Sequence, residues 1–187
     1  MSGPHIKWTN LRVPLSNMIK QPGMEAIKLV EKAFTESAAM VSATSIGIMR
    51  RAFEIALKFA QTDSRNGPHP IIGYQSVADQ LVDSKAKIEA SRMLVWKACD
   101  DLDKGLGSER ALLSKIFVAD TCMDVVVACA RVVGTIALDT DSFPFDELIS
   151  DACCMSIFDG GNIGIRRRQV QAIFSDPSYT AEISRGF

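Results

Sequence analysis

The sequence has few residues of the kinds that bind metals or build disulfide frameworks. Its two histidines, His5 and His69, lie in polar surroundings with no cysteine or histidine at ligand spacing. Its five cysteines are odd in number, lie in apolar stretches and form no C-x-x-C pair, which is typical of reduced, buried thiols. They are Cys99, Cys122, Cys129, Cys153 and Cys154. We therefore expect neither a metal site nor a disulfide framework.

The sequence also lacks an excess of charge and any long apolar run. Its 21 lysines and arginines nearly balance its 22 aspartates and glutamates, so the net charge is -1. Such a balance creates no global field that would attract nucleic acid or an anionic membrane. No stretch approaches the roughly 18 apolar residues of a membrane span, and the first residues do not read as a signal peptide. We expect a cytoplasmic protein that binds neither nucleic acid nor membrane.

What the sequence does contain is periodic. Apolar residues recur at helical spacing over three long segments and two shorter ones, separated by glycine, proline and polar turns. The predicted helices cover residues 33–61, about 76–104, 108–133, 145–157 and about 162–174. Long antiparallel helices with short connections pack as an up-down bundle. The sequence thus predicts an all-α protein, an up-down four-helix bundle with an extra C-terminal helix.

The first segment has a different pattern. From Ile6 to Val13 apolar and polar residues alternate, which predicts a short residual strand ahead of the bundle. With 187 residues, 47% of them hydrophobic, the chain can bury one core. We expect a single domain over residues 1–187, in which residues 1–14 are the strand segment and residues 175–187 a tail.

Asp159 is the residue that most resembles a catalytic group. It stands between an apolar run and the paired glycines Gly160 and Gly161, where backbone or ligand can approach closely. Burial disfavours an ionised carboxyl group and a nearby arginine favours it, and such a balance suits a general base. An aspartate here could equally cap the following helix. The residues themselves leave both interpretations open.

Other features near Asp159 are less specific. The glycines of Asp159-Gly-Gly-Asn-Ile-Gly164 do not form a nucleotide P-loop, because no strand precedes them and no Gly-Lys-Ser or Gly-Lys-Thr follows. The arginines at positions 166 to 168 span less than one helical turn, so at most one or two can face the same site. Ser37, among small residues on a helix, would ordinarily bond the preceding turn.

Four segments together carry a family resemblance. They are Asp63-Ser-Arg65, the segments 74–85 and 89–97, and Phe158-Asp-Gly-Gly-Asn-Ile-Gly-Ile-Arg-Arg-Arg-Gln169. On these segments the chain resembles the C-terminal helical domain of the acyl-CoA dehydrogenase superfamily, with the nitroalkane oxidases as the branch it resembles most. The resemblance implies that Asp159 removes a proton alpha to a carbonyl or nitro group. It also implies that Arg166 lies beside that carboxylate and that the Ser37 hydroxyl bonds in the same site.

The same resemblance implies flavin contacts elsewhere in the chain. Arg65 and Gln75 match positions that touch the ADP portion of FAD, often across a subunit interface. Gly134 matches the first glycine of a flavin-contacting Gly-Gly-x-Gly turn, whose second and third glycines are missing here. These three residues are candidate cofactor contacts only if flavin is bound.

Family members carry an N-terminal helical domain and a central β domain before the helical part. This sequence contains neither of them. The first hypothesis is therefore an enzyme of specialised metabolism without a cofactor, in which Asp159 and Arg166 line the pocket that flavin and substrate occupy in the family. It would isomerise or cyclise a small apolar substrate by proton transfer. The second hypothesis is an FAD-dependent oxidoreductase whose flavin-binding half is supplied by a separate polypeptide or by an omitted part of the same gene. The third is a non-catalytic helical interaction module. A homodimer or homotetramer is expected from the resemblance.

Overall fold

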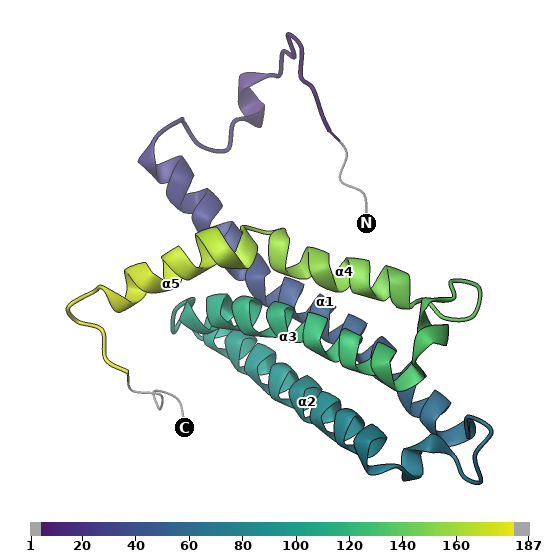
Figure 1. Cartoon of the computed structure of the whole chain (residues 1–187). Coiled ribbons are helices and arrows are strands. Elements are labelled where there is room, and N and C mark those ends of the chain that lie inside the picture. Colours follow the sequence, from purple (N-terminus) through teal and green to yellow (C-terminus); the bar gives the residue numbers. More distant parts are fainter. Residues whose placement is uncertain (1–4, 182–187) are drawn as a thin grey trace.

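The structure, a computed structural model, describes residues 5–181 of the chain, and every regular element in that range is helical (Figure 1). The five α-helices are α1 (Met24–Thr62), α2 (Gln75–Asp103), α3 (Glu109–Val133), α4 (Phe145–Ile157) and α5 (Arg167–Phe174). Three short 3-10 turns lie at Leu15–Asn17, Ile71–Gly73 and Thr135–Leu138. A π-helical turn, η4 (Gly161–Arg166), joins α4 to α5.

Helix α3 is the centre of the bundle. It packs against α1, α2 and α4, and α5 lies across one of its ends (Figure 1). Apolar side chains of these helices form one main core, with Met49, Ile88, Val126 and Phe145 among its most buried members. The predicted all-α bundle with an extra C-terminal helix is confirmed.

The contact between α1 and α3 depends on small residues. Ala38, Ser42 and Ala52 of α1 are fully buried, and Ser42 Oγ lies 3.1 Å from Ser114 Oγ of α3. Small side chains let two helix backbones approach closely, and α1 contains no proline that would bend it. Helix α1 therefore runs along the whole bundle and carries side chains to both of its ends.

Two boundaries differ from the sequence-based expectation. Helix α1 begins at Met24, nine positions before residue 33, because good helix formers follow Gly23 although most of their side chains are exposed. The fifth helical segment starts as the π-helical turn and becomes α-helical only at Arg167. The other predicted helices lie within two residues of the observed ones.

The predicted strand is wrong for the described residues. Residues 6–13 form no strand, and their apolar side chains, Trp8 among them, are exposed. A strand needs a neighbouring strand to pair its backbone N–H and C=O groups, and residues 5–181 offer none. Residues 1–4 and 182–187, parts of the expected strand segment and tail, lie outside the described residues.

Candidate active site

Asp159 lies in a tight turn between α4 and η4. Its φ angle is +52°, and those of Gly160 and Gly161 are +90° and +60°. Three consecutive residues in the left-handed region reverse the chain within a few positions, which glycine permits at little cost and aspartate tolerates better than most residues. The turn directs the Asp159 side chain at helix α1.

Both carboxylate oxygens of Asp159 accept hydrogen bonds from side chains. Ser37 Oγ of α1 lies 3.0 Å from Oδ1, and Arg166 Nη2 lies 2.9 Å from Oδ2. The Asp159 side chain is only 8% exposed. No side chain caps η4 by a hydrogen bond, so Asp159 is not the helix cap that the sequence left open. It is instead a buried, ionically paired carboxylate.

Arg166 bonds both the backbone and the side chain of Asp159 and links the turn to α1. Its Nε donates to the Asp159 carbonyl oxygen at 2.8 Å, and its Nη2 also donates to the Phe34 carbonyl oxygen at 2.8 Å. The π-helical turn places Arg166 seven residues after Asp159 yet beside it, and π-helical turns recur at functional sites. Of the three arginines only Arg166 is buried, while Arg167 pairs with Asp120 at the surface.

Gly160 is required by this arrangement. A Cβ atom at this position would lie 3.0 Å from Arg166 Nε and 3.2 Å from its Cζ. The guanidinium group therefore rests against the bare backbone of the turn. A side chain at Gly160 would both strain the positive φ and push Arg166 out of place.

Two further buried polar side chains support the turn from α3. Lys115 is 0% exposed, and its Nζ donates to the Met155 carbonyl oxygen and, at 3.1 Å, to Asn162 Oδ1. Asn162 Nδ2 in turn donates to Asp120 Oδ1 at 2.8 Å and to the Ile116 carbonyl oxygen at 3.2 Å. Burial lowers the pKa of Lys115, the negative charge of Asp159 opposes that change, and the charge of Arg166 adds to it.

A cavity lies next to Arg166, between the N-terminal half of α1 and the start of α5. Its volume is about 630 Å³. It is lined by Val30, Glu31, Phe34, Gly160, Ile165, Arg166, Arg168, Gln169 and Ala172. Its walls combine apolar side chains with the arginine that pairs with Asp159, and this mixture suits a small, largely apolar ligand.

The candidate flavin residues gather at the opposite end of the bundle. The Arg65 guanidinium donates to the Val133 carbonyl oxygen and lies 5.0 Å from the Phe59 ring centre. A Cβ atom on Gly134 would lie 2.8 Å from Arg65 Nη2. Gln75, exposed at the start of α2, donates to Asp79 Oδ1 at 2.6 Å. Arg65 and Gly134 thus lie in contact. Among residues 5–181, Gln75 forms no hydrogen bond to either of them.

These two groups of residues are far apart in one chain. Ser37 and Thr62 are 25 positions apart on α1, which at about 1.5 Å per residue separates them by about 38 Å. The structure therefore brings Asp159, Arg166 and Ser37 together and keeps them apart from Arg65, Gln75 and Gly134.

Lys115 and Asn162 were missed in the sequence. Lys115 lies on the buried face of α3, at helical spacing from the buried residues Ala111, Leu112, Ala119 and Cys122. A lysine on the apolar face of a helix was a detectable signal, since lysine is almost never fully buried without partners. Among residues 5–181 no group of three or more histidine, cysteine, aspartate or glutamate side chains could hold a metal ion. No helix in that range is long and apolar enough to cross a membrane.

Comparison with known proteins gives a consistent family. The model of the acyl-CoA dehydrogenase C-terminal domain matches residues 27–174. Nitroalkane oxidase of Fusarium oxysporum is 45% identical over 184 residues, which cover 95% of this chain and 42% of the relative. Nitroalkane oxidase of Podospora anserina is 40% identical and is covered over 43% of its length. The chain thus spans less than half the length of these curated relatives.

A solved structure points the same way. The structure of the flavoprotein nitroalkane oxidase, determined to analyse an arginine and an aspartate in its reaction, superimposes with a TM-score of 0.88. It is 41% identical and covers 92% of this chain and 41% of the other. That arginine and aspartate are seven positions apart, as Arg166 and Asp159 are here.

These relatives correct two expectations. The expectation that no cofactor is needed is wrong, because a relative at 41% identity is a flavoprotein. Nothing in the comparisons supports an isomerase, a cyclase or a place in specialised metabolism, and the relatives are oxidases and dehydrogenases instead. The matched family model, the sequence identities and the superimposed helices agree with one another, and the chain belongs to the acyl-CoA dehydrogenase family as a C-terminal helical domain.

Proposed function

We propose that this chain is the C-terminal part of an FAD-dependent oxidase that acts on nitroalkanes, with Asp159 as the base that removes a proton from the carbon bearing the nitro group. The observation that carries the proposal is a buried carboxylate held by Ser37 and Arg166. Nitroalkane oxidases are the relatives with 40% and 45% identity, whereas cyclohexane-1-carbonyl-CoA dehydrogenase has 29%. The nitro compound is therefore the preferred substrate class.

The geometry suits proton abstraction. Arg166 and Ser37 each bond one oxygen of Asp159, so the carboxylate is held in position before it meets the substrate. In the reaction the carbon–hydrogen bond breaks, the proton passes to Asp159 and the electron pair stays with the substrate. Because the side chains of Asp159 and Arg166 are only 8% and 1% exposed, their charges interact more strongly than they would in solvent.

The chain's own residues fit one part of a flavin. The Arg65 side chain is 46% exposed and has N–H groups left to meet an anionic pyrophosphate. Its guanidinium packs against the bare backbone of Gly134, where a Cβ atom would lie 2.8 Å from Nη2. When bound, the flavin supplies the acceptor for the two electrons that the substrate loses.

One flavin cannot contact both groups of residues within one chain, because about 38 Å of helix α1 lies between Ser37 and Thr62. We therefore propose that Arg65 and Gly134 of one copy serve the Asp159 site of a second copy. This arrangement requires a homodimer or a homotetramer. It also leaves the isoalloxazine ring to be covered by a flavin-binding portion outside this chain.

The first prediction tests the proposed function in flavin-loaded protein, with oxidation of 1-nitrohexane as the assay. We expect Asp159→Asn to lower turnover by about 100- to 10,000-fold, the usual contribution of a general base. The matched control is Asp83→Asn, an exposed aspartate on α2, which should leave turnover unchanged.

Two results would contradict the proposal. Protein that binds flavin stoichiometrically but oxidises no nitroalkane would exclude this substrate class. An Asp159→Asn variant with unchanged turnover would exclude Asp159 as the base. If Asp159→Asn changed no measurable activity or ligand binding, the chain would be a non-catalytic interaction module.

A further inference from the structure

Lys115 lies under the Asp159 turn, and nothing in the proposed reaction uses it directly. Its ammonium group is completely buried and donates to two acceptors, neither of which is a carboxylate. The ring centre of Phe158 lies 5.6 Å from Nζ and adds a cation–π contact. A buried lysine is unfavourable unless its charge is well solvated by the protein, so its presence here calls for a physical reason.

The two acceptors lie on opposite sides of Asp159. The Met155 carbonyl belongs to the last turn of α4, where carbonyl groups have no partner within the helix. Asn162 belongs to the first turn of η4. One ammonium group thus joins the segment before the turn to the segment after it. Only residues 156–161 lie between the two points that it holds.

Asn162 is itself oriented by α3. Its amide nitrogen donates to Asp120 Oδ1 and to the Ile116 carbonyl, which leaves its oxygen for Lys115. All of these partners come from consecutive turns of α3. The turn that carries Asp159 is therefore attached to α3, the helix at the centre of the bundle.

We propose that Lys115 is a positioning residue for Asp159: by joining the Met155 carbonyl to the Asn162 side chain it holds the intervening turn in its left-handed conformation. We call this link from the Met155 carbonyl through Lys115 to Asn162 the Lys115 clamp. The role of Asp159 as the base rests on the proposed function, but the clamp does not. The positive charge also faces the charged groups of the site, which are Asp159, Arg166 and Asp120, and Cys154 lies near them. A neutral donor could form the same two hydrogen bonds, but it would not bring a positive charge near these groups.

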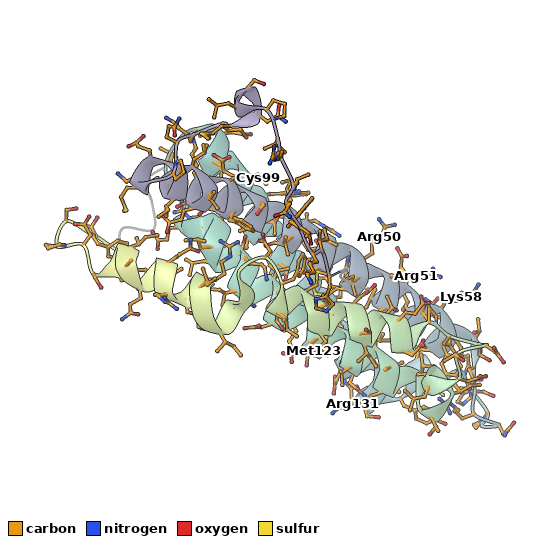
Figure 2. All side chains as sticks on the ribbon, turned by 90° about the horizontal axis from the view of Figure 1, so that it is seen from above. Arg50, Arg51, Lys58, Cys99, Met123 and Arg131 are labelled. Carbon is orange, nitrogen blue, oxygen red and sulfur yellow. The ribbon has the colours of Figure 1, made fainter. Side chains whose placement is uncertain are left out.

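The second prediction concerns amide hydrogen exchange in the 187-residue chain, measured without flavin or substrate. We expect Lys115→Met to accelerate exchange of the amides of residues 158–163 by about tenfold, the loss of roughly one net hydrogen bond. Amides in the middle of α1, α2 and α3 should keep their rates. Lys58→Met is the matched control, because Lys58 projects from α1 away from the other helices (Figure 2) and is about 30 Å along that helix from Ser37.

A second variant guards against failure of Lys115→Met to fold. Asn162→Ala removes the other end of the clamp and should accelerate exchange in the same six residues. Lys115→Arg keeps a charged donor and should restore slow exchange at least in part. Unchanged exchange in residues 158–163, or an acceleration spread evenly over the bundle, would overturn the proposal.

Kinetics in flavin-loaded protein provide the functional readout. We expect Lys115→Met to lower kcat for 1-nitrohexane by about tenfold with KM within about twofold, because a displaced base affects the chemical step more than binding. Lys115→Arg should recover most of the loss. Equal changes in kcat for Lys58→Met would overturn the assignment. If exchange responds as expected while unsubstituted protein oxidises no nitroalkane, the proposed function fails and the clamp holds.

Discussion

Single residues in unusual conformations define the site. Asp159, Gly160 and Gly161 all have positive φ, and for a residue other than glycine this conformation costs roughly 1 kcal/mol or more. Such a turn persists only if its surroundings determine it. Ser37 and Arg166 hold the Asp159 carboxylate, and Lys115 and Asn162 hold the backbone on either side. The strain is thus balanced by contacts from α1, α3 and η4.

The third prediction separates backbone strain from contact with Arg166. Gly160 and Gly161 both have positive φ, but only at Gly160 would a Cβ atom meet the guanidinium, whereas at Gly161 it would meet nothing within 4 Å. We expect Gly161→Ala to lower the free energy of unfolding by about 1 kcal/mol through φ alone. Gly160→Ala should lower it by about 3 kcal/mol, because Arg166 must also move.

Chemical denaturation of both variants measures these energies, and the oxidation assay measures whether Arg166 has been displaced. Gly160→Ala should lose most of its turnover while Gly161→Ala keeps most of it. Equal effects of the two substitutions would mean that the close approach of Arg166 to Gly160 is unimportant.

At the scale of elements, the corner between α2 and α3 contains a buried charge apart from those around Asp159. Asp101, in the last turn of α2, is 3% exposed. It pairs with Arg110 at the start of α3, and Lys97 Nζ lies 3.0 Å from its Oδ1. Burial opposes ionisation of Asp101, but hydrogen bonds from Arg110 and Lys97 outweigh burial and lower its pKa. This ion pair joins two helices that only a short loop connects.

The fourth prediction follows from the direction of that pKa shift. A carboxyl group whose pKa is lower in the folded than in the unfolded state stabilises the fold above the unfolded value of about 4. That stabilisation is lost as the pH falls through the folded pKa. Asp101→Asn should therefore lower the free energy of unfolding at pH 7 by about 1–3 kcal/mol, because a neutral amide cannot replace the charge-assisted hydrogen bonds that the Asp101 carboxylate accepts from Arg110 and Lys97.

Urea denaturation at a series of pH values checks this expectation. The difference between Asp101→Asn and unsubstituted protein should shrink as the pH falls below about 4. A difference that stays constant from pH 7 to pH 2 would show that the loss comes from packing rather than from the charge. Asp83→Asn on the exposed face of α2 is the control and should change stability little at any pH.

At the scale of the molecule, the bundle interior is apolar enough to suppress thiol chemistry. Burial raises the pKa of Cys122 to about 12 and that of Cys129 to about 11. Cys99 and Cys153 are exposed. Because the thiolate is the nucleophile, reactivity follows both ionisation and access. The same interior surrounds Lys115 and Arg166, so charges there depend on their few protein partners.

The fifth prediction uses this contrast as a probe of the fold. With iodoacetamide at pH 8 we expect Cys99 and Cys153 to be alkylated in native protein, and Cys122 and Cys129 only after unfolding in urea. Peptide mass spectrometry reports each site. Alkylation of Cys122 at the rate of Cys99 in native protein would contradict the packing of α3 in the centre of the bundle.

The part of the fold that the sequence predicted is the part set by local repetition. The bounds of α4, Phe145 and Ile157, were predicted to the residue, because a proline, a glycine pair and helical periodicity delimit it. The strand from Ile6 to Val13 was wrong, because alternation describes a pattern but cannot supply a neighbouring strand. The early start of α1 was missed, because exposed residues carry no periodic signal.

The site residues also fall into those that the sequence indicated and those that only the structure revealed. Asp159 stood out by its glycine neighbours, and Arg166, Ser37, Arg65, Gln75 and Gly134 were proposed only through the family resemblance. Lys115 was overlooked, because one lysine on an otherwise apolar helix face does not interrupt the helical periodicity. That Lys115, 44 positions before Asp159, supports the Asp159 turn could be seen only once α3 and α4 were packed together.

By itself the sequence determined the helices and their order, since these depend on local spacing and residue type. Tertiary structure alone decided which charges are buried and what they touch. It brought Ser37 of α1, Lys115 of α3 and Arg166 of η4 around one turn. The physical reason is that a buried charge is stable only beside specific partners, and those partners come from elements far apart in the chain.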